Sequence, residues 1–366
     1  MNSRRVMIDF RHIDKKNGFS SYLIMILRAL NSSDKGFLLL VNENNFDFGK
    51  YLQHNKNIKF VKAKSKPFSF YQNIEIPFLI KKYRADVFHS INFDVPLFMF
   101  LAPKCKLIST IHDLIPIKYK NIHKRSFIKN IYFEIMYRMC ALLSSKILTV
   151  SNFSRTEIIN TLKVPAKRIT KIYNSYSLHH SENYSKCLTN SCYNLLFVGT
   201  NFEHKNIYTV IKAVVMLKKK NINVRFNIVG GETKYTLFLK REIARYNLED
   251  CVFIFGKVND TLLTALYEQA DCFVFPSLAE GFGIPILEAM YFGLPLITSN
   301  KTIMPEIVAD AGIMIDPTPE NYAEKIEYLI KNPRIAKNLI HRGNARVKNF
   351  SEEKFNKKML RVYQEV

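Results

Sequence analysis

The sequence predicts an α/β protein built from two doubly wound domains, each with a parallel sheet covered by helices. Short β-branched and aromatic runs recur with helical segments between them, which is typical of parallel α/β folding. The runs fall into two sets, separated by a stretch at 174–192 that is rich in Ser, Asn and His and lacks periodicity. A chain of 366 residues with 48% hydrophobic content is long enough to build two cores of ordinary domain size.

Thirteen strands are predicted from these runs. In the first half of the chain, they are expected at 4–10, 37–41, 58–61, 86–89, 107–111, 146–150 and 170–173. In the second half, they are expected at 194–198, 225–229, 252–255, 272–275, 296–298 and 313–315. We therefore predict a first domain at 1–173, a linker at 174–192, a second domain at 193–350 and an amphipathic final segment at 351–366.

The positive charge belongs to the first half of the chain. The net charge is +23, but residues 1–173 hold 30 basic and 11 acidic side chains, whereas residues 174–366 hold 24 and 20. Such a field suits nucleic acid, an anionic membrane surface or a phosphorylated acceptor, and charge alone does not separate these partners.

The cysteines indicate a reduced, cytoplasmic protein. They show no C-x-x-C pair and no zinc-like spacing to His, and most lie in apolar segments: Cys105, Cys140, Cys187, Cys192, Cys251 and Cys272. Asp9 and Arg11 interrupt the first apolar run, so no signal peptide is expected. The longest apolar stretch, at 95–103, is about half of what a spanning helix needs, so any membrane contact is expected to be peripheral.

The segment at 276–290 carries the most specific chemistry. It follows the apolar run 272–275, and its two carboxylates, Glu280 and Glu288, bracket seven residues. We expect a buried strand, a Gly-containing turn and then a helix, so that main-chain N–H groups around Gly281, Phe282 and Gly283 form an anion cradle. Carboxylates accept hydrogen bonds from hydroxyls, and a ligand with both hydroxyls and phosphates is a nucleotide sugar. Surface acids at a helix N-terminus are the alternative.

This segment resembles the glutamate-x7-glutamate signature of retaining glycosyltransferases of family 4. The resemblance implies the GT-B fold, in which two doubly wound Rossmann-like domains face an interdomain cleft and the last helix crosses back to the first domain. It also implies that Glu280 lies against the donor sugar and that Glu288 holds the nucleotide ribose. The residues between them that are expected to contact the donor are Gly281, Phe282, Gly283 and Ile284.

A lysine is predicted to neutralise the donor diphosphate. Lys205 stands at the expected start of a helix at 207–220, where its charge would also stabilise the leaving group. The segment resembles the basic diphosphate-binding motif of family 4. It departs from that motif because His204 precedes the lysine where an Arg is usual, and Thr200 stands where some members carry another Arg. A solvated lysine is the alternative.

The first domain offers a His-Asp pair at the end of a predicted strand. His112 and Asp113 follow 107–111 and resemble a His-Asp motif of family 4, which implies that His112 faces the donor sugar and that Asp113 lies on the acceptor side. An isolated His is more often structural, and the Glu280 segment is what favours the functional interpretation.

Three weaker resemblances complete the predicted site. Gly18 lies in a segment similar to the Gly-rich loop of the family, although an ordinary turn is nearly as good an interpretation. Arg155 lies in a segment similar to the end of the family's first domain and is placed on the acceptor side. Lys257 and Val258 follow a strand at the place where family members receive the nucleobase on main-chain groups.

Two further expectations concern helices of the first domain. Ser154 is a candidate helix N-cap, with Glu157 closing a capping box. The segment 118–138 alternates basic and apolar residues, and we expect most of its apolar residues to pack in the core, leaving a basic edge for an anionic membrane leaflet.

Together these features predict transfer of a hexose, with retention, from a nucleoside diphosphate sugar to a lipid-linked glycan in O-antigen or capsule biosynthesis. The resemblance favours GDP-mannose slightly, and UDP-hexoses and UDP-N-acetylhexosamines stay open. Because the sequence contains no Asp-x-Asp, we expect no metal and no cofactor.

A nucleotide-sugar epimerase of related fold is an alternative function. A nucleic-acid-binding protein ranks far below, since no RRM, zinc-finger or KH signature is present.

Overall fold

The computed structural model describes residues 4–13, 18–42, 48–49, 51–118, 126–176 and 192–366. These residues form two compact units. Unit 1 takes the described residues between 4 and 175 together with 351–366, and unit 2 takes 176 and 192–350. Most of the predicted linker therefore lies outside the described residues.

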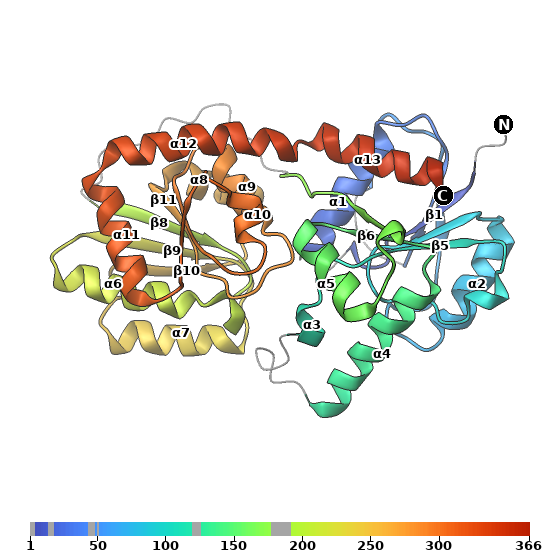
Figure 1. The fold of residues 1–366 in the computed structure, drawn as a ribbon, viewed down its shortest axis with the longest axis horizontal. Helices are drawn as coiled ribbons and strands as arrows, with labels where there is room; N and C mark the ends of the chain where they lie inside the picture. Colours follow the sequence, from blue (N-terminus) through green and yellow to red (C-terminus); the bar gives the residue numbers. More distant parts are fainter. Residues whose placement is uncertain (1–3, 14–17, 43–47, 50, 119–125, 177–191) are drawn as a thin grey trace. The chain divides into compact units, whose positions relative to one another are not determined.

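Unit 1 is built on a parallel sheet in the order β3-β2-β1-β4-β5-β6-β7 (Figure 1). Its strands are β1 (Val6–Asp9), β2 (Phe37–Val41), β3 (Ile58–Lys62), β4 (Val87–Ser90), β5 (Lys106–Thr110), β6 (Lys146–Thr149) and β7 (Ile169–Lys171). β2 is buried along its whole length, as expected of a parallel strand covered on both faces. β3 forms an edge of the sheet and exposes Lys59 and Lys62, charges that oppose pairing with another chain.

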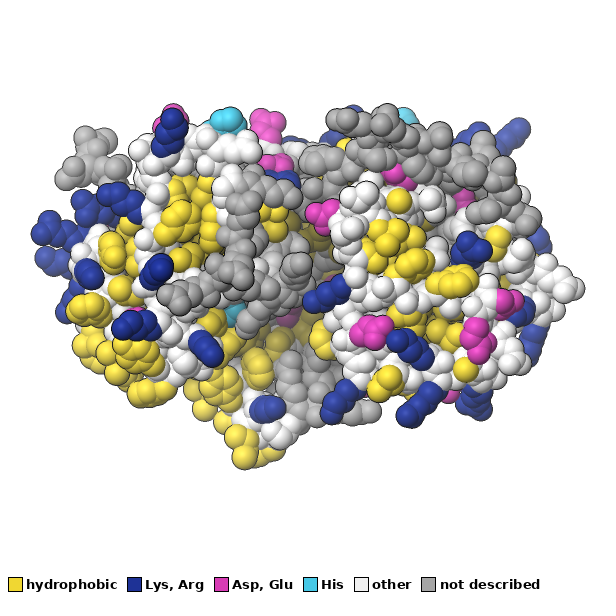
Figure 2. All heavy atoms as spheres, turned by 180° about the vertical axis from the view of Figure 1, so that it is seen from behind, with side chains coloured by type: hydrophobic (Ala, Val, Ile, Leu, Met, Phe, Trp, Pro, Cys, Tyr) yellow, Lys and Arg dark blue, Asp and Glu magenta, His cyan; other side chains and the backbone are white. Residues whose placement is uncertain are grey.

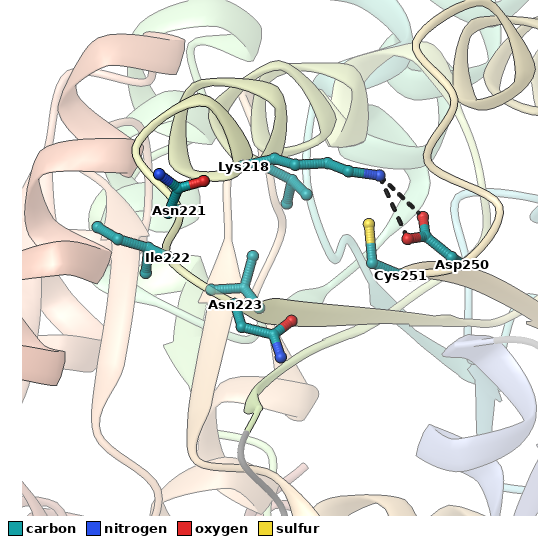
Figure 3. Close-up of a pocket in the computed structure, with 8 residues that line it drawn as sticks. Lys218, Asn221, Ile222, Asn223, Asp250 and Cys251 are labelled. Carbon is teal, nitrogen blue, oxygen red and sulfur yellow. Dashed lines mark hydrogen bonds and ion pairs between the residues drawn. The ribbon is translucent and has the colours of Figure 1, made fainter.

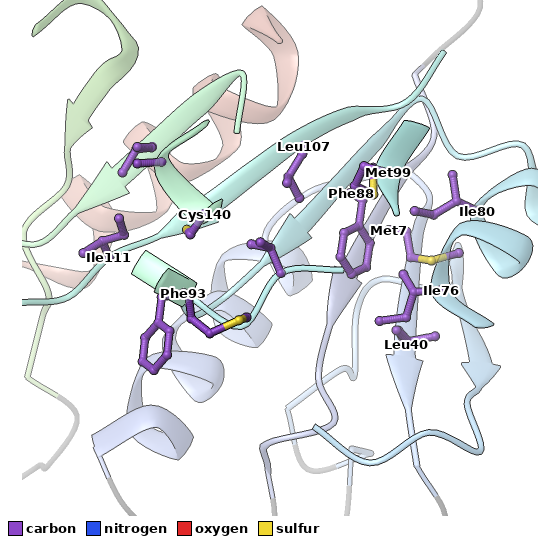
Figure 4. Packing of buried hydrophobic residues seen from close by; sticks show 14 of the residues in the cluster. Met7, Leu40, Ile76, Ile80, Phe88, Phe93, Met99, Leu107, Ile111 and Cys140 are labelled. Carbon is purple, nitrogen blue, oxygen red and sulfur yellow. The ribbon is translucent and has the colours of Figure 1, made fainter. Parts of the chain in front are cut away.

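Helices cover both faces of this sheet. They are α1 (Gly18–Asn31), α2 (Gln72–Tyr83), α3 (Ile115–Lys118), α4 (Phe127–Leu143), α5 (Asn152–Leu162) and α13 (Glu352–Glu365), with short 3-10 turns η2 (Met99–Leu101) and η4 (Ala166–Arg168). Figure 4 shows the core on one face, where Met7 and Leu40 of the sheet meet Ile76 and Ile80 of α2. The same core includes residues of α4 and α5, whereas α13 packs on α1.

Unit 2 repeats the winding with the order β10-β9-β8-β11-β12-β13, again parallel. Its strands are β8 (Tyr193–Val198), β9 (Val224–Val229), β10 (Val252–Gly256), β11 (Cys272–Phe275), β12 (Leu296–Ser299) and β13 (Ile313–Ile315). Its helical elements are η5 (Glu203–Lys205), α6 (Ile207–Lys219), α7 (Lys234–Arg245), α8 (Asp260–Gln269), α9 (Ile284–Tyr291), α10 (Met304–Val308), α11 (Pro319–Lys331), α12 (Pro333–Val347) and η6 (Lys348–Phe350).

The predicted fold class is confirmed, since both units are doubly wound parallel α/β structures. Each predicted strand coincides with an observed strand to within a few residues. The largest displacement is at β7, which covers Ile169–Lys171 where 170–173 was predicted. No helix among the described residues has the length and hydropathy required to span a bilayer.

Two expectations about helices of unit 1 are wrong. Ser151, not Ser154, is the N-cap of α5, and its side chain accepts a hydrogen bond from the Ser154 N–H at 2.9 Å. Ser154 instead donates its hydroxyl to the carbonyl oxygen of His112, and Glu157 pairs with Lys118. Ser154 is the third residue of α5, so its N–H is one of the first-turn donors that have no partner within the helix and need a cap.

The segment 118–138 does not bury most of its apolar residues. α4 begins at Phe127, and residues 119–125 lie outside the described part of the chain. Of the apolar residues in α4 that were expected in the core, only Met136 and Tyr137 are buried, and Phe133 is half-buried. The others are exposed to solvent: Phe127, Ile128, Ile131, Tyr132 and Ile135. Only the second half of α4 therefore packs on the sheet.

Candidate active site

The strand order of unit 2 indicates where a ligand would bind. The order reverses between β8 and β11, and ligands of open α/β sheets bind beyond the carboxyl ends of the strands at such a reversal. Lys205 follows β8 and Glu280 follows β11. The two predicted catalytic residues of unit 2 therefore come from the two segments that flank the reversal.

Lys205 and Glu280 form an ion pair. Lys205 Nζ lies 2.5 Å from Glu280 Oε1, and only 14% and 10% of the two side chains are exposed. The ammonium group also lies 5.6 Å from the centre of the Phe275 ring, a distance at which a cation and an aromatic ring attract each other. The structure thus joins two residues that are 75 positions apart in the chain.

Two hydrogen bonds hold the segments of this pair together. The Leu278 N–H donates to the carbonyl oxygen of His204 at 2.8 Å, and the Asn206 side-chain amide donates to the carbonyl oxygen of Pro276 at 3.3 Å. Asn206 has a positive φ of 54°, a conformation that Asn tolerates better than most residues, and it occupies the N-cap position of α6 without a side-chain capping hydrogen bond. The position of Lys205 is therefore fixed by its neighbours in the chain.

The turn after Glu280 leads into α9 through Gly283. Gly283 has φ of 89°, and a Cβ placed there would lie 3.1 Å from Ile286 Cδ1, so a side chain would meet both strain and crowding. Gly281 is half-buried, Phe282 is buried, and Ile284 is the first residue of α9. The Glu280 N–H donates to Thr302 Oγ1 at 3.2 Å, which ties the turn to the segment after β12.

Glu288 lies on α9 and is buried. Its Oε2 accepts a hydrogen bond from the Tyr267 hydroxyl of α8 at 2.8 Å. Burial raises the pKa of Glu288 to about 7, although the Tyr267 hydrogen bond opposes this shift. Sequence reasoning did not single out Tyr267, because nothing in its own helix distinguishes it from a core aromatic residue.

The side chains of Thr200 and Lys257 both lie close to Gly231, the second of two glycines that follow β9. A Cβ on Gly231 would lie 3.2 Å from Lys257 Cε and 3.5 Å from Thr200 Cγ2. A Cβ on Gly230, whose φ is 143°, would overlap the carbonyl oxygen of Gly199. Val258 follows β10 and is half-buried. Sequence reasoning missed this glycine pair, although two glycines directly after a strand are a recognisable signal of close backbone approach.

In unit 1, His112 follows β5 as predicted. Its Nε2 lies 3.1 Å from the carbonyl oxygen of Ile91, and its ring meets the Tyr22 ring edge to face at 4.7 Å. Burial lowers the pKa of His112 to about 4, so the imidazole is neutral at pH 7 and donates from Nε2. Nδ1 then carries the lone pair, which can accept a hydrogen bond.

The remaining predicted residues of unit 1 serve the local backbone. Asp113 Oδ1 accepts a hydrogen bond from the Ile115 N–H at 2.9 Å. The Arg155 guanidinium donates to the carbonyl oxygen of Ala166 at 3.2 Å. Gly18 is the first residue of α1, and the segment 14–17 before it lies outside the described residues.

A buried hydroxyl network lies behind His112. His89 Nδ1 is 2.8 Å from the Tyr363 hydroxyl of α13, and His89 Nε2 is 2.9 Å from Thr110 Oγ1. The Tyr22 hydroxyl is 3.2 Å from the same Thr110 oxygen. Burial lowers the pKa of His89 to about 3. Sequence reasoning missed these residues, because they lie far apart in the chain and only the packing of α1 and α13 brings them together.

A pocket of about 240 Å³ lies at the other edge of the unit 2 sheet (Figure 3). It is lined by residues that precede β9 and β10, among them Asn223 and Cys251, and by Lys218, which is paired with Asp250 at 3.1 Å. This is the edge where the strands begin, whereas the predicted donor residues follow the ends of the strands. The pocket is therefore separate from the candidate site.

Comparison with known proteins places the chain among glycosyltransferases. Residues 17–180 match the family model described as Glycosyltransferase Family 4, and residues 191–346 match the model described as Glycosyl transferases group 1. O-antigen chain mannosyltransferase B from Escherichia coli is 31% identical over 296 residues, which make up 78% of this chain and 75% of that protein.

Two further proteins show the range of similarity. O-antigen chain mannosyltransferase RfbU from Salmonella typhimurium is 32% identical over 219 residues, which make up 58% of this chain and 57% of that protein. The crystal structure of Anabaena Alr3699/HepE in complex with UDP-glucose superposes with a TM-score of 0.77 at 17% identity and covers 99% of this chain and 100% of that one. At that identity the likeness concerns the fold.

The two doubly wound units and this structural similarity define a glycosyltransferase of the GT-B fold. The chain belongs to glycosyltransferase family 4, since the two matched models together cover most of it and a relative above 30% identity spans 78% of its length. The resemblance carried by the Glu280 segment is thereby confirmed.

Proposed function

We propose that the protein transfers a hexose, with retention and without a metal ion, from a nucleoside diphosphate sugar to a lipid-linked glycan of a bacterial surface polysaccharide. The observation that carries the proposal is the Lys205–Glu280 pair beside the strand reversal of unit 2. The proposed site of action is the cytoplasm, at the inner face of the cytoplasmic membrane.

In this proposal Lys205 exchanges its carboxylate partner for the donor diphosphate. Its ammonium then stabilises the negative charge that develops on the leaving nucleotide, together with the N–H groups at the start of α9. Glu280, released from Lys205, accepts hydrogen bonds from sugar hydroxyls. Lys257 and Thr200 flank the backbone at Gly231, where the rest of the nucleotide would approach.

Glu288 is proposed to hold the ribose. Burial raises the pKa of this carboxyl to about 7. Hydroxyl groups that donate hydrogen bonds to it stabilise the carboxylate and so lower this pKa. The ribose supplies two such donors, in addition to the Tyr267 hydroxyl. The leaving phosphate oxygen takes the acceptor proton, and no protein base is assigned. In unit 1, His112, Asp113, Arg155 and Gly18 are proposed to contact the donor sugar or the acceptor.

GDP-mannose is the proposed donor, because two of the most similar relatives are O-antigen chain mannosyltransferases. The UDP-glucose bound by Anabaena Alr3699/HepE makes UDP-hexoses the comparison to test. Initial rates with labelled GDP-mannose, UDP-glucose and UDP-N-acetylglucosamine, with lipid-linked oligosaccharide as acceptor, should be highest with GDP-mannose. A chelator should leave the rate unchanged, and the new linkage should keep the anomeric configuration of the donor.

Glu288→Gln should weaken donor binding about tenfold, since it replaces a charged hydrogen-bond acceptor with a neutral one. The measurement is the dissociation constant of the nucleotide by calorimetry. The matched control is Glu268→Gln, another buried glutamate of unit 2, which lies on α8. Unchanged affinity in Glu288→Gln would show that the ribose assignment is wrong.

A further inference from the structure

Unit 1 exposes an unusual amount of apolar side chain on three neighbouring segments. Of the large hydrophobic side chains that are exposed in the described residues, fourteen belong to unit 1 and seven to unit 2. Thirteen of the fourteen fall on or next to α2, η2 and α4: Phe68, Phe70, Tyr71, Ile74, Phe78, Phe100, Leu101, Phe127, Ile128, Ile131, Tyr132, Ile135 and Leu142. We call these residues the α2–α4 surface.

α4 is apolar on two opposite faces. Ile128, Ile131 and Ile135 recur at spacings of three and four residues, so they share one exposed face. The other face buries Met136 and Cys140 in the core. A surface helix normally presents charged and polar residues to water, and a helix that is apolar all round is buried in something. The exposed apolar face of α4 is therefore expected to bind another apolar surface.

α2 follows the same pattern. Tyr71, Ile74 and Phe78 form an exposed apolar stripe that leads to Lys81 and Lys82, which are also exposed. The opposite face packs into the core through residues such as Ile76, Leu79 and Ile80. The sequence of α2 thus combines an apolar stripe with a cationic end.

Aromatic contacts connect the three segments of this surface, and the connection to α4 runs through the buried Phe93. Phe70 lies 6.1 Å from Phe98 and Phe98 lies 5.7 Å from Phe100, measured between ring centres, which joins the start of α2 to η2. Phe93 lies 5.7 Å from Phe68 and 5.6 Å from Phe133, which joins the same region to α4. Figure 2 shows hydrophobic side chains gathered along the lower margin of unit 1, on the left of that view.

The charges around this surface are mainly positive. Among the described residues between 66 and 138, nine are basic and five are acidic. Two of the acids are engaged inside the fold: Glu75 accepts from the backbone N–H groups of Lys64 and Ser65, and Asp94 accepts from the Phe68 N–H. Exposed lysines lie in or beside the three segments: Lys66, Lys81, Lys82, Lys104 and Lys129.

We propose that the α2–α4 surface inserts its apolar side chains into an anionic lipid bilayer, with the lysines at the lipid headgroups. Exposed aromatic and aliphatic side chains with a cationic rim match the requirements of interfacial binding, in which apolar burial and attraction to anionic lipid add together. A second copy of the chain fits less well, because a self-complementary contact would bring cationic rims together. The choice of a bilayer rests on the proposed lipid-linked acceptor.

The test is co-sedimentation of the full chain with vesicles of phosphatidylcholine alone or of equal parts phosphatidylcholine and phosphatidylglycerol. The wild-type chain should bind the anionic vesicles, and binding should fall as salt is raised. Phe127→Ser combined with Ile128→Ser should weaken binding about tenfold or more, because these side chains are 77% and 78% exposed and would be buried in lipid. Lys81→Glu combined with Lys82→Glu should weaken it by about fivefold for each residue.

The matched control is Leu237→Ser combined with Leu262→Ser, which removes two exposed apolar side chains of unit 2. This control should bind anionic vesicles like the wild type. Equal binding by the Phe127/Ile128 variant, or no binding by the wild type, would overturn the proposal. So would a wild-type dimer in sedimentation velocity that the same variant converts to a monomer, since the covering would then be a second copy. Binding of nucleotide by calorimetry is measured separately, so a failure here leaves the donor assignment intact.

Discussion

Both units place a reversal of strand order beside their first strand, and an ion pair lies near each reversal. In unit 1 the reversal falls between β1 and β4, and Arg11 Nη2 lies 2.7 Å from Asp9 Oδ2. The two side chains are 0% and 2% exposed, and the guanidinium also donates to Ser65 and Gln72. In unit 2 the Lys205–Glu280 pair remains partly exposed, at 14% and 10%.

The difference lies in how the two cations are bound. A guanidinium that donates to several buried acceptors is fixed, and removing it leaves uncompensated groups in the interior. An ammonium at the open end of a sheet can change its partner without disturbing a core. The strand reversals of two similar sheets therefore lie beside a structural pair in unit 1 and, under the proposed function, an exchangeable pair in unit 2.

Removing the structural pair should have the largest effect on stability. Arg11→Met leaves the Asp9 carboxylate buried without its cation, and we expect it to lower the free energy of unfolding by about 3 to 5 kcal/mol. Urea unfolding followed by circular dichroism measures this, since the chain contains no Trp. If Arg11→Met lowered the free energy of unfolding no more than Lys205→Met does, the distinction between the two pairs would be wrong.

Removing the exchangeable pair should act on turnover. Lys205→Met should lower kcat by about a hundredfold to a thousandfold, the usual effect of losing a group that stabilises transition-state charge. Lys218→Met is the matched control, because this lysine of unit 2 pairs with Asp250 away from the ends of the strands. If both variants kept wild-type kcat, the proposed role of Lys205 would fail.

The buried histidines should make unit 1 sensitive to acid. Burial lowers the pKa of His89 to about 3 and that of His112 to about 4. Below about pH 6.5 these histidines are therefore protonated in the unfolded chain but still neutral in the folded chain. Stability should therefore fall as the pH drops from 7 to 5, by about 2 kcal/mol for each histidine. Asp94 opposes this, because burial raises its pKa to about 6 and protonation favours the folded state there.

His89→Gln isolates one of these contributions. It keeps polar atoms near Tyr363 and Thr110 but does not titrate, so the stability lost between pH 7 and pH 5 should shrink by about 2 kcal/mol. The measurement is urea unfolding at the two pH values. An unchanged pH dependence would show that His89 is not the group responsible.

The smallest expected effect is at Thr302. This β-branched residue has a positive φ of 48°, and its hydroxyl accepts the Glu280 N–H. Thr302→Val removes the acceptor and should lower kcat several-fold by loosening the Glu280 turn, a cost of about 1 kcal/mol. Thr302→Ser keeps the hydroxyl and should restore the rate, which separates the hydrogen bond from the side-chain shape.

The sequence allowed the fold to be predicted because buried parallel strands read as short apolar runs between helices, as at 37–41 and 272–275. It also identified the Lys205 and Glu280 segments, since each is a local motif at a strand end. It missed Tyr267 and the His89 network, because those contacts depend on how separate helices pack.

The error at α4 has a different origin. Periodicity shows that a helix has an apolar face, but it does not show how many faces the sheet can cover. The apolar residues of α4 were assigned to the core because a helix between two strands of a doubly wound domain must bury an apolar face. The structure buries Met136 and Tyr137 and leaves Ile128 and Ile131 in solvent, a distribution that depends on where the helix leaves the sheet.

The Lys205–Glu280 contact also bears on which small anions the proposed donor site can bind. A bare pyrophosphate would take the ammonium away from Glu280 and leave that carboxylate mostly shielded from water with no hydroxyl to receive. A complete donor brings its own hydroxyl groups to the abandoned oxygen atoms. Under the proposed function, the site should therefore bind a nucleoside diphosphate sugar in preference to inorganic pyrophosphate, because only the sugar supplies hydroxyl groups to Glu280.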